Sequence, residues 1–135
     1  WDWFMQLGSD DFLLPGGAEK IVETMQVHPF ASFNELFFFK KDTRKGTHLK
    51  GYRCGAGRFI SREIVDKVKT MWNDRVKGCD GYSHGRVEEV HKPRIHTMEG
   101  CFIADVKTEV NVTPYFQATP EVFEMDSIIP EAELI

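Results

Sequence analysis

The sequence lacks the features of several broad protein classes. None of its 135 residues belong to an apolar run of the roughly eighteen residues that a helix needs to span a bilayer. No charged N-terminal region precedes a short apolar segment, so no secretory signal is predicted. Basic residues do not dominate, because 17 Lys and Arg stand against 21 Asp and Glu for a formal net charge of -4. We therefore expect no nucleic-acid partner, no transmembrane segment and a cytoplasmic location.

Cysteine is scarce, and its spacing excludes two common frameworks. Cys54, Cys79 and Cys101 are the three cysteines in the sequence, an odd number with no Cys-x-x-Cys pair. This pattern argues against a disulfide framework and against a zinc site, and it favours a reducing compartment. Hydrophobic content of 41% and charged content of 28% lie within the range of globular proteins, so one domain with a true core is expected.

The periodicity of apolar residues predicts helices alternating with strands. The opening run, residues 1–7, is expected to be a buried strand. Helical spacing is found over residues 17–27, from Arg62 to about Trp72 with Ser61 as N-cap, and from Asp80 onward. Residues 35–40 and 47–53 favour an antiparallel hairpin, and residues 101–106 a short strand. The sequence therefore predicts an α/β fold with a mixed sheet and flanking helices.

Two adjacent carboxylates follow the first predicted strand. Asp10 and Asp11 close the segment Gly8-Ser9-Asp10-Asp11, which precedes a Pro15-Gly16-Gly17 turn. Hard divalent cations prefer oxygen ligands, and open α/β folds bind ligands at strand ends. The same residues are also ordinary in loops and helix caps, so this motif alone leaves a metal site and a structural turn as alternatives.

Four separated segments resemble one family in the same order. They are residues 3–16, residues 55–62, residues 71–74 with 77–80, and residues 104–112. The chain is similar to the second half of a family-2-like glycosyltransferase with the type A (GT-A) fold, of the phage and bacterial kind. The resemblance implies transfer of a sugar from a nucleotide-diphosphate donor to a saccharide or another hydroxyl acceptor, in the host cytoplasm if the protein is phage-encoded.

The resemblance assigns roles to particular residues. In that family an Asp-x-Asp motif binds Mn²⁺ or Mg²⁺. In this sequence Ser9 occupies the first position of the motif, so the resemblance assigns the metal to Asp11 and Asp10. It also implies that Asp10 would hold sugar or ribose hydroxyls. Asp80 would be the general base for the acceptor, and the alternative is that it is an N-cap. Gly55, Ala56 and Gly57 would lie against sugar and acceptor, where the alternative is a tight turn.

Other residues and the domain boundaries remain as expectations. Trp72 is either a core residue or a platform for the acceptor. His84, one turn after Asp80, is expected to be exposed, with a role as metal ligand as the alternative. The sequence begins at Trp1 within an apolar run, so we expect residues 1–118 to be the metal and acceptor half, with the nucleotide-binding half of the same protein upstream. Residues 119–135 are expected to form an acidic C-terminal arm.

Two further functions compete with the enzyme. The first is a carbohydrate-binding or virion-associated structural module that keeps this fold without catalysis. The second is a metal-dependent phosphate enzyme that uses Asp10 and Asp11 without a sugar. That function would leave the glycine segment and Asp80 unexplained.

Overall fold

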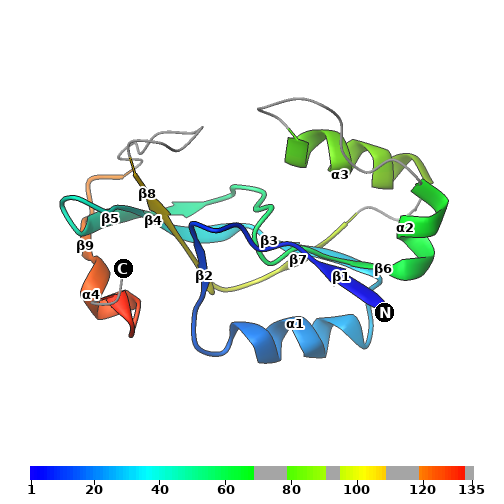
Figure 1. The fold of residues 1–135 in the computed structure, drawn as a ribbon, viewed down its shortest axis with the longest axis horizontal. Coiled ribbons are helices and arrows are strands. Elements are labelled where there is room, and N and C mark those ends of the chain that lie inside the picture. Colours follow the sequence, from blue (N-terminus) through cyan, green and yellow to red (C-terminus); the bar gives the residue numbers. More distant parts are fainter. Residues whose placement is uncertain (69–78, 91–94, 109–118, 133–135) are drawn as a thin grey trace.

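The computed structural model describes residues 1–68, 79–90, 95–108 and 119–132 (Figure 1). The described part is a mixed α/β fold, which confirms the predicted class. The strands form two mixed sheets, where the sequence predicted one. None of the described helices is long and apolar enough to cross a membrane.

The four-stranded sheet has the order β1-β6-β3-β7. Its strands are β1 (Trp3–Met5), β6 (Phe59–Ser61), β3 (Phe30–Phe33) and β7 (His96–Met98). The expectation that the opening run is buried was wrong, because Trp3 is 36% exposed and Met5 40%. The reason is that β1 is the edge strand of this sheet and pairs, among the described residues, with β6 alone.

The five-stranded sheet has the order β2-β8-β4-β5-β9. Its strands are β2 (Asp11–Leu13), β8 (Ile103–Lys107), β4 (Glu35–Lys40), β5 (Lys45–Lys50) and β9 (Phe123–Glu124). The predicted hairpin is confirmed, since β4 and β5 pair antiparallel. Strand β8 lies between β2 and β4, antiparallel to β2 and parallel to β4. This sheet therefore brings the start of β2 beside the end of β8.

Three of the helices begin close to where the sequence predicted them. They are α1 (Gly17–Met25), α2 (Arg62–Val68) and α3 (Cys79–Val90), and a short α4 (Met125–Ile128) follows β9. The cap of α2 is confirmed, because the backbone N–H of Ile64 donates to Ser61 Oγ at 3.4 Å. Figure 1 shows α1 on one side of the strands and α3 on the opposite side.

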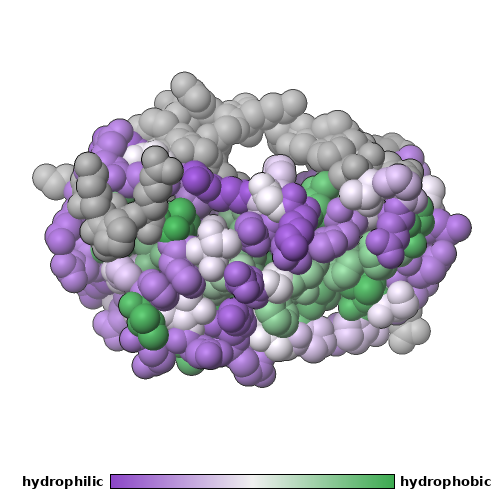
Figure 2. All heavy atoms as spheres, turned by 180° about the vertical axis from the view of Figure 1, so that it is seen from behind, coloured by the Kyte–Doolittle hydropathy of each residue, from purple (hydrophilic) through white to green (hydrophobic). Residues whose placement is uncertain are grey.

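Successive side chains of β4 point to opposite faces of the five-stranded sheet and so contribute to two separate parts of the core. Leu36 and Phe38 pack into one cluster with residues of the other sheet, whereas Phe39 packs into a second cluster with Met125 of α4. The described part of the predicted acidic arm is therefore packed on the sheet. On the face turned away in Figure 1, hydrophobic residues gather toward the half of the molecule that holds this sheet and α4, and hydrophilic residues dominate elsewhere (Figure 2).

His84 is buried, and the expectation that it is exposed was wrong. Its exposure is 1%, and its ring lies 5.7 Å from the ring of Phe30. The burial of His84 could not be predicted from the periodicity of α3, because two glycines and several polar residues leave the helix without a clear apolar face. Burial, and then the positive charge of Arg58, lowers the pKa of His84 to about 3, so the ring is neutral.

Candidate metal centre

A pocket of about 220 Å³ lies against one face of the five-stranded sheet. Leu36 and Phe38 of β4 and Leu49 of β5 provide its apolar lining. Its polar lining comes from three places in the sequence, namely the turn before β2, the segment after β5 and the end of β8. These polar residues are Asp10, Asp11, Tyr52, Cys54, Asp105 and Lys107, and Gly55 and Ala56 lie beside them.

Strand pairing brings the carboxylates together. The antiparallel register of β2 and β8 sets Asp11 opposite Asp105, and residues directly opposite in such a pair have neighbouring side chains. Asp10 immediately precedes β2, and its carbonyl oxygen accepts from the N–H of Val106 at 2.9 Å. One carboxylate oxygen from each of Asp10, Asp11 and Asp105 lies within 4.8 Å of the other two. Three acidic side chains thus converge on one point.

Lys107 is the positive charge of this cluster. Its Nζ lies 3.0 Å from Asp10 Oδ2 and 3.0 Å from Asp105 Oδ2, and its side chain is 11% exposed. Burial lowers the pKa of Lys107, but the hydrogen bonds to Asp10 and Asp105 outweigh burial and raise it. The ammonium therefore stays charged and holds two of the three carboxylates.

Asp105 carries the strongest electrostatic perturbation in the pocket. Burial raises the pKa of Asp105 to about 7, Lys107 lowers it in part, and the charges of Asp11 and Asp10 add to the rise. Its Oδ1 is buried and has no hydrogen-bond partner among the described residues. A buried acceptor of this kind is expected to take a proton or a cation.

The donor set fits a hard divalent cation. With Lys107 charged and Asp10, Asp11 and Asp105 ionised, three negative charges and one positive charge leave two negative charges for a dication to balance. All ligand atoms would be carboxylate oxygens, which Mg²⁺ and Mn²⁺ prefer. The orphaned Oδ1 of Asp105 is the observation that favours such an ion.

Asp11 also has the structural role considered as the alternative. Asp11 Oδ2 accepts from the N–H of Gly8 at 2.9 Å, and the N–H of Asp11 donates to the carbonyl of Gly8 at 3.2 Å. This pattern closes the turn before β2. The carboxylate of Asp11 therefore both shapes the turn and lines the pocket.

The structure brings together four of the residues that the sequence singled out, namely Asp10, Asp11, Gly55 and Ala56. Gly57 lies outside the pocket lining, with φ +75 and with Phe33 and Ile103 side chains 3.0 Å from where a Cβ would stand. Asp80 is the second residue of α3, but its side chain, like the whole of Trp72, lies outside the described residues.

Sequence reasoning did not identify Asp105 and Lys107 as site residues. A usable signal exists, because a strand alternates its faces and Ile103, Asp105 and Lys107 share one. Two charged residues on the same face as a buried Ile103 indicate a polar site within the fold.

Comparison of the chain with protein-family models, with curated proteins and with solved structures finds no match. The function is therefore argued from the site.

Proposed function

We propose that this pocket binds Mn²⁺ or Mg²⁺ together with the diphosphate of a nucleotide-sugar, and that the chain is the metal and acceptor half of a GT-A glycosyltransferase. The observation that carries the proposal is the convergence of Asp10, Asp11 and Asp105 beside Gly55 and Ala56 in one pocket. Lys107 offsets only one of the three negative charges, so the repulsion between the carboxylates favours a bound cation.

The residues of the pocket have complementary roles in this proposal. Asp10, Asp11 and Asp105 would hold the cation, which when bound neutralises charge developing on the leaving diphosphate. The Lys107 ammonium keeps the carboxylates together and adds a positive charge beside the phosphates. Tyr52, 50% exposed at the pocket, offers a ring face to a sugar or base.

The wall and the size of the pocket decide which part of the donor it would take. Gly55 and Ala56 keep bulk low, so a ligand can approach the backbone. A volume of about 220 Å³ is below the range of about 300–1,000 Å³ for pockets that enclose a whole small molecule. In this proposal the diphosphate binds in the pocket, and the nucleoside and the acceptor bind to surfaces outside it. Asp80 is the base that accepts the proton of the acceptor hydroxyl.

Calorimetric titration of the full-length protein with UDP and GDP, with and without Mn²⁺, tests this proposal. We expect binding that requires Mn²⁺, and at least about tenfold weaker binding in Asp11→Asn, which is about 1.4 kcal/mol. Asp66→Asn is the matched control, because Asp66 is an exposed carboxylate on α2 outside the pocket. Asp80→Asn should keep binding and lose turnover.

Three outcomes would overturn or redirect the assignment. If neither nucleotide binds in the presence of Mn²⁺, the transferase proposal fails. Saccharide binding that needs no cation and survives Asp11→Asn would instead support the carbohydrate-binding module. Mn²⁺-dependent binding of inorganic diphosphate with no preference for a nucleotide would favour a phosphate enzyme.

A further inference from the structure

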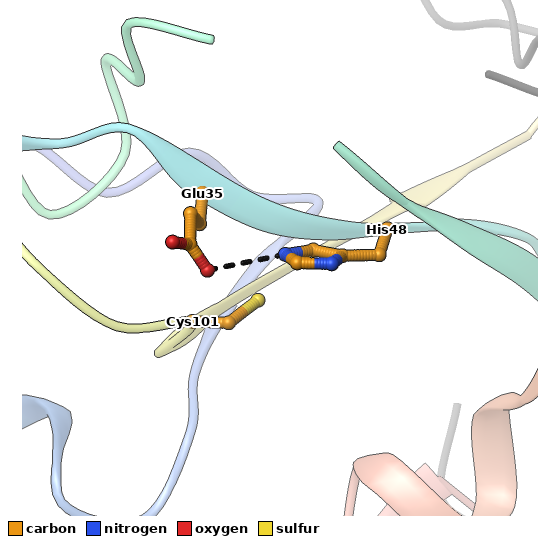
Figure 3. A group of neighbouring side chains, drawn as sticks. All are labelled: Glu35, His48 and Cys101. Atoms are coloured by element: carbon orange, nitrogen blue, oxygen red, sulfur yellow. Dashed lines mark hydrogen bonds and ion pairs between the residues drawn. The ribbon is translucent and has the colours of Figure 1, made fainter. Parts of the chain in front are cut away.

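A second cluster of ligand-type side chains lies on the other face of the five-stranded sheet. It consists of Glu35 at the start of β4, His48 in β5 and Cys101, two residues before β8 (Figure 3). We propose that these three residues form a binding site for a borderline-soft divalent cation, Zn²⁺, distinct from the carboxylate pocket. The inference stands independently of the proposed transferase function.

The sheet register assembles this site from distant parts of the sequence. His48 pairs directly with Phe37, and Glu35 lies two residues before Phe37 on the same strand. The side chains of His48 and Glu35 therefore lie on the same face of the sheet as that of Phe37. Strand β8 runs parallel beside β4, which carries Cys101 to the same end. Leu36 and its neighbours in the pocket lie on the opposite face. The absence of a Cys-x-x-Cys spacing argued against zinc, but these ligands come from separate strands and leave no local motif.

The distances agree with tetrahedral coordination. His48 Nε2 and Glu35 Oε2 are 3.2 Å apart. Two ligand atoms at about 2.0–2.1 Å from a tetrahedral zinc ion stand about 3.3 Å from each other. The Cys101 thiol supplies the third ligand atom, and the three ligand atoms all lie within 4.8 Å of one another. Tetrahedral coordination would place the sulfur about 3.5 Å from each of the other two ligand atoms. The thiol therefore has to move by at most about 1.3 Å, within the reach of a rotamer adjustment.

A nucleophilic triad explains the cluster less well. In a triad, thiol and carboxylate engage opposite nitrogens of the imidazole. Figure 3 shows the Cys101 sulfur on the side of the ring that faces Glu35, near the line from Nε2 to the carboxylate. Three donors that point toward one place describe ligands of one ion. Burial, and then the charge of Glu35, also raises the pKa of the Cys101 thiol to about 12, which opposes a free thiolate nucleophile.

Charge and access fit a divalent ion as well. A thiolate and a carboxylate together balance a dication, and imidazole binds as the neutral ring. Lys50 Nζ lies 3.8 Å from the other oxygen of Glu35, on a side chain 75% exposed that can move into solvent. The side chains of His48 and Glu35 are 31% and 17% exposed, so an ion can enter, and three protein ligands leave one position for water. Thiolate and imidazole favour zinc over Mg²⁺, whereas the carboxylate pocket has the reverse preference.

Titration of the reduced protein with Co²⁺, a spectroscopic substitute for zinc, tests this site. We expect one equivalent to give thiolate-to-cobalt charge-transfer absorption and tetrahedral d–d bands, and Zn²⁺ to displace it. Cys101→Ser should abolish the charge-transfer band, and His48→Gln and Glu35→Gln should each weaken binding at least about tenfold. The matched control is Cys54→Ser, the buried cysteine on the pocket side, which should keep the band.

The variants also separate the site from other sources of signal. Circular dichroism of each variant shows that it is folded before titration. Asp11→Asn should leave the cobalt spectrum unchanged, even if it removes nucleotide binding, so the two proposals can fail separately. Absence of a stoichiometric complex, or a charge-transfer band that survives Cys101→Ser, would overturn the proposal.

Discussion

Asp105→Asn probes the electrostatics of the carboxylate pocket through stability. In the folded protein burial raises the pKa of Asp105 to about 7, and the ordinary carboxyl value of 3.8 applies to the unfolded chain. Between these values the folded state binds one more proton than the unfolded state. The contribution of Asp105 to stability is therefore complete below pH 3.8 and is lost as the pH rises toward 7. The difference between a pKa of 3.8 and one of about 7 corresponds to about 4 kcal/mol.

The variant should not show this loss, because an amide does not ionise. Asparagine keeps an oxygen for Lys107 and leaves its amide nitrogen at the position of the buried, unpartnered Oδ1. That nitrogen costs about 1–3 kcal/mol at every pH. The informative quantity is therefore the pH dependence of the difference between wild type and variant. We expect wild type to lose about 4 kcal/mol relative to Asp105→Asn between about pH 4 and about pH 8.

Urea unfolding across this pH range measures the difference directly. Asp66→Asn is the control, because its side chain is 68% exposed and outside the pocket, and its curve should stay parallel to wild type. Parallel curves for wild type and Asp105→Asn would refute the account of Asp105. Mn²⁺ adds a second readout, since a cation in place of the proton should restore wild-type stability at about pH 8 and do less for the variant.

Three further predictions concern the frame around the site. Wild type should lose about 2 kcal/mol relative to His84→Leu between about pH 6.5 and about pH 4.5, because the unfolded chain takes up a proton on His84 in this range while the buried ring, with a pKa of about 3, stays neutral; urea unfolding at both pH values measures this. Gly57→Ala should destabilise by about 1–3 kcal/mol, owing to φ +75 and the contacts at 3.0 Å, and a thermal melt unchanged from wild type would contradict this. Ser61→Ala should lower the free energy of unfolding by about 1 kcal/mol through loss of the α2 cap, with Ser127→Ala as a surface control.

Elements set by local patterns could be predicted from the sequence. The spacing of Ile21 and Met25 defines α1, and Ser61 before an apolar period marks the start of α2. The hairpin of β4 and β5 follows from two strand-like runs joined by a short polar loop. In each case the interactions that decide the structure lie within a few residues of one another.

Features that depend on distant pairing could not be predicted in this way. The exposure of β1 depends on its edge position in a sheet, and the burial of His84 depends on what packs over α3. Asp10 and Asp11 were identified because they are adjacent. Asp105 is 94 residues after Asp11 in the sequence, and the register of β2 and β8 places the two residues opposite each other. No local pattern encodes that register.

The alternation of β4 has a consequence for how this protein tolerates change. Its even-numbered positions, Leu36 and Phe38, line the carboxylate pocket, and its odd-numbered position Glu35 belongs to the thiol and imidazole cluster. Insertion or deletion of a single codon within β4 would exchange the two sets between the faces. Such a change would damage both chemistries at once, whereas the same change in the loop at residues 41–44 would be accommodated. The two sites are therefore expected to be inherited together, since one strand carries both.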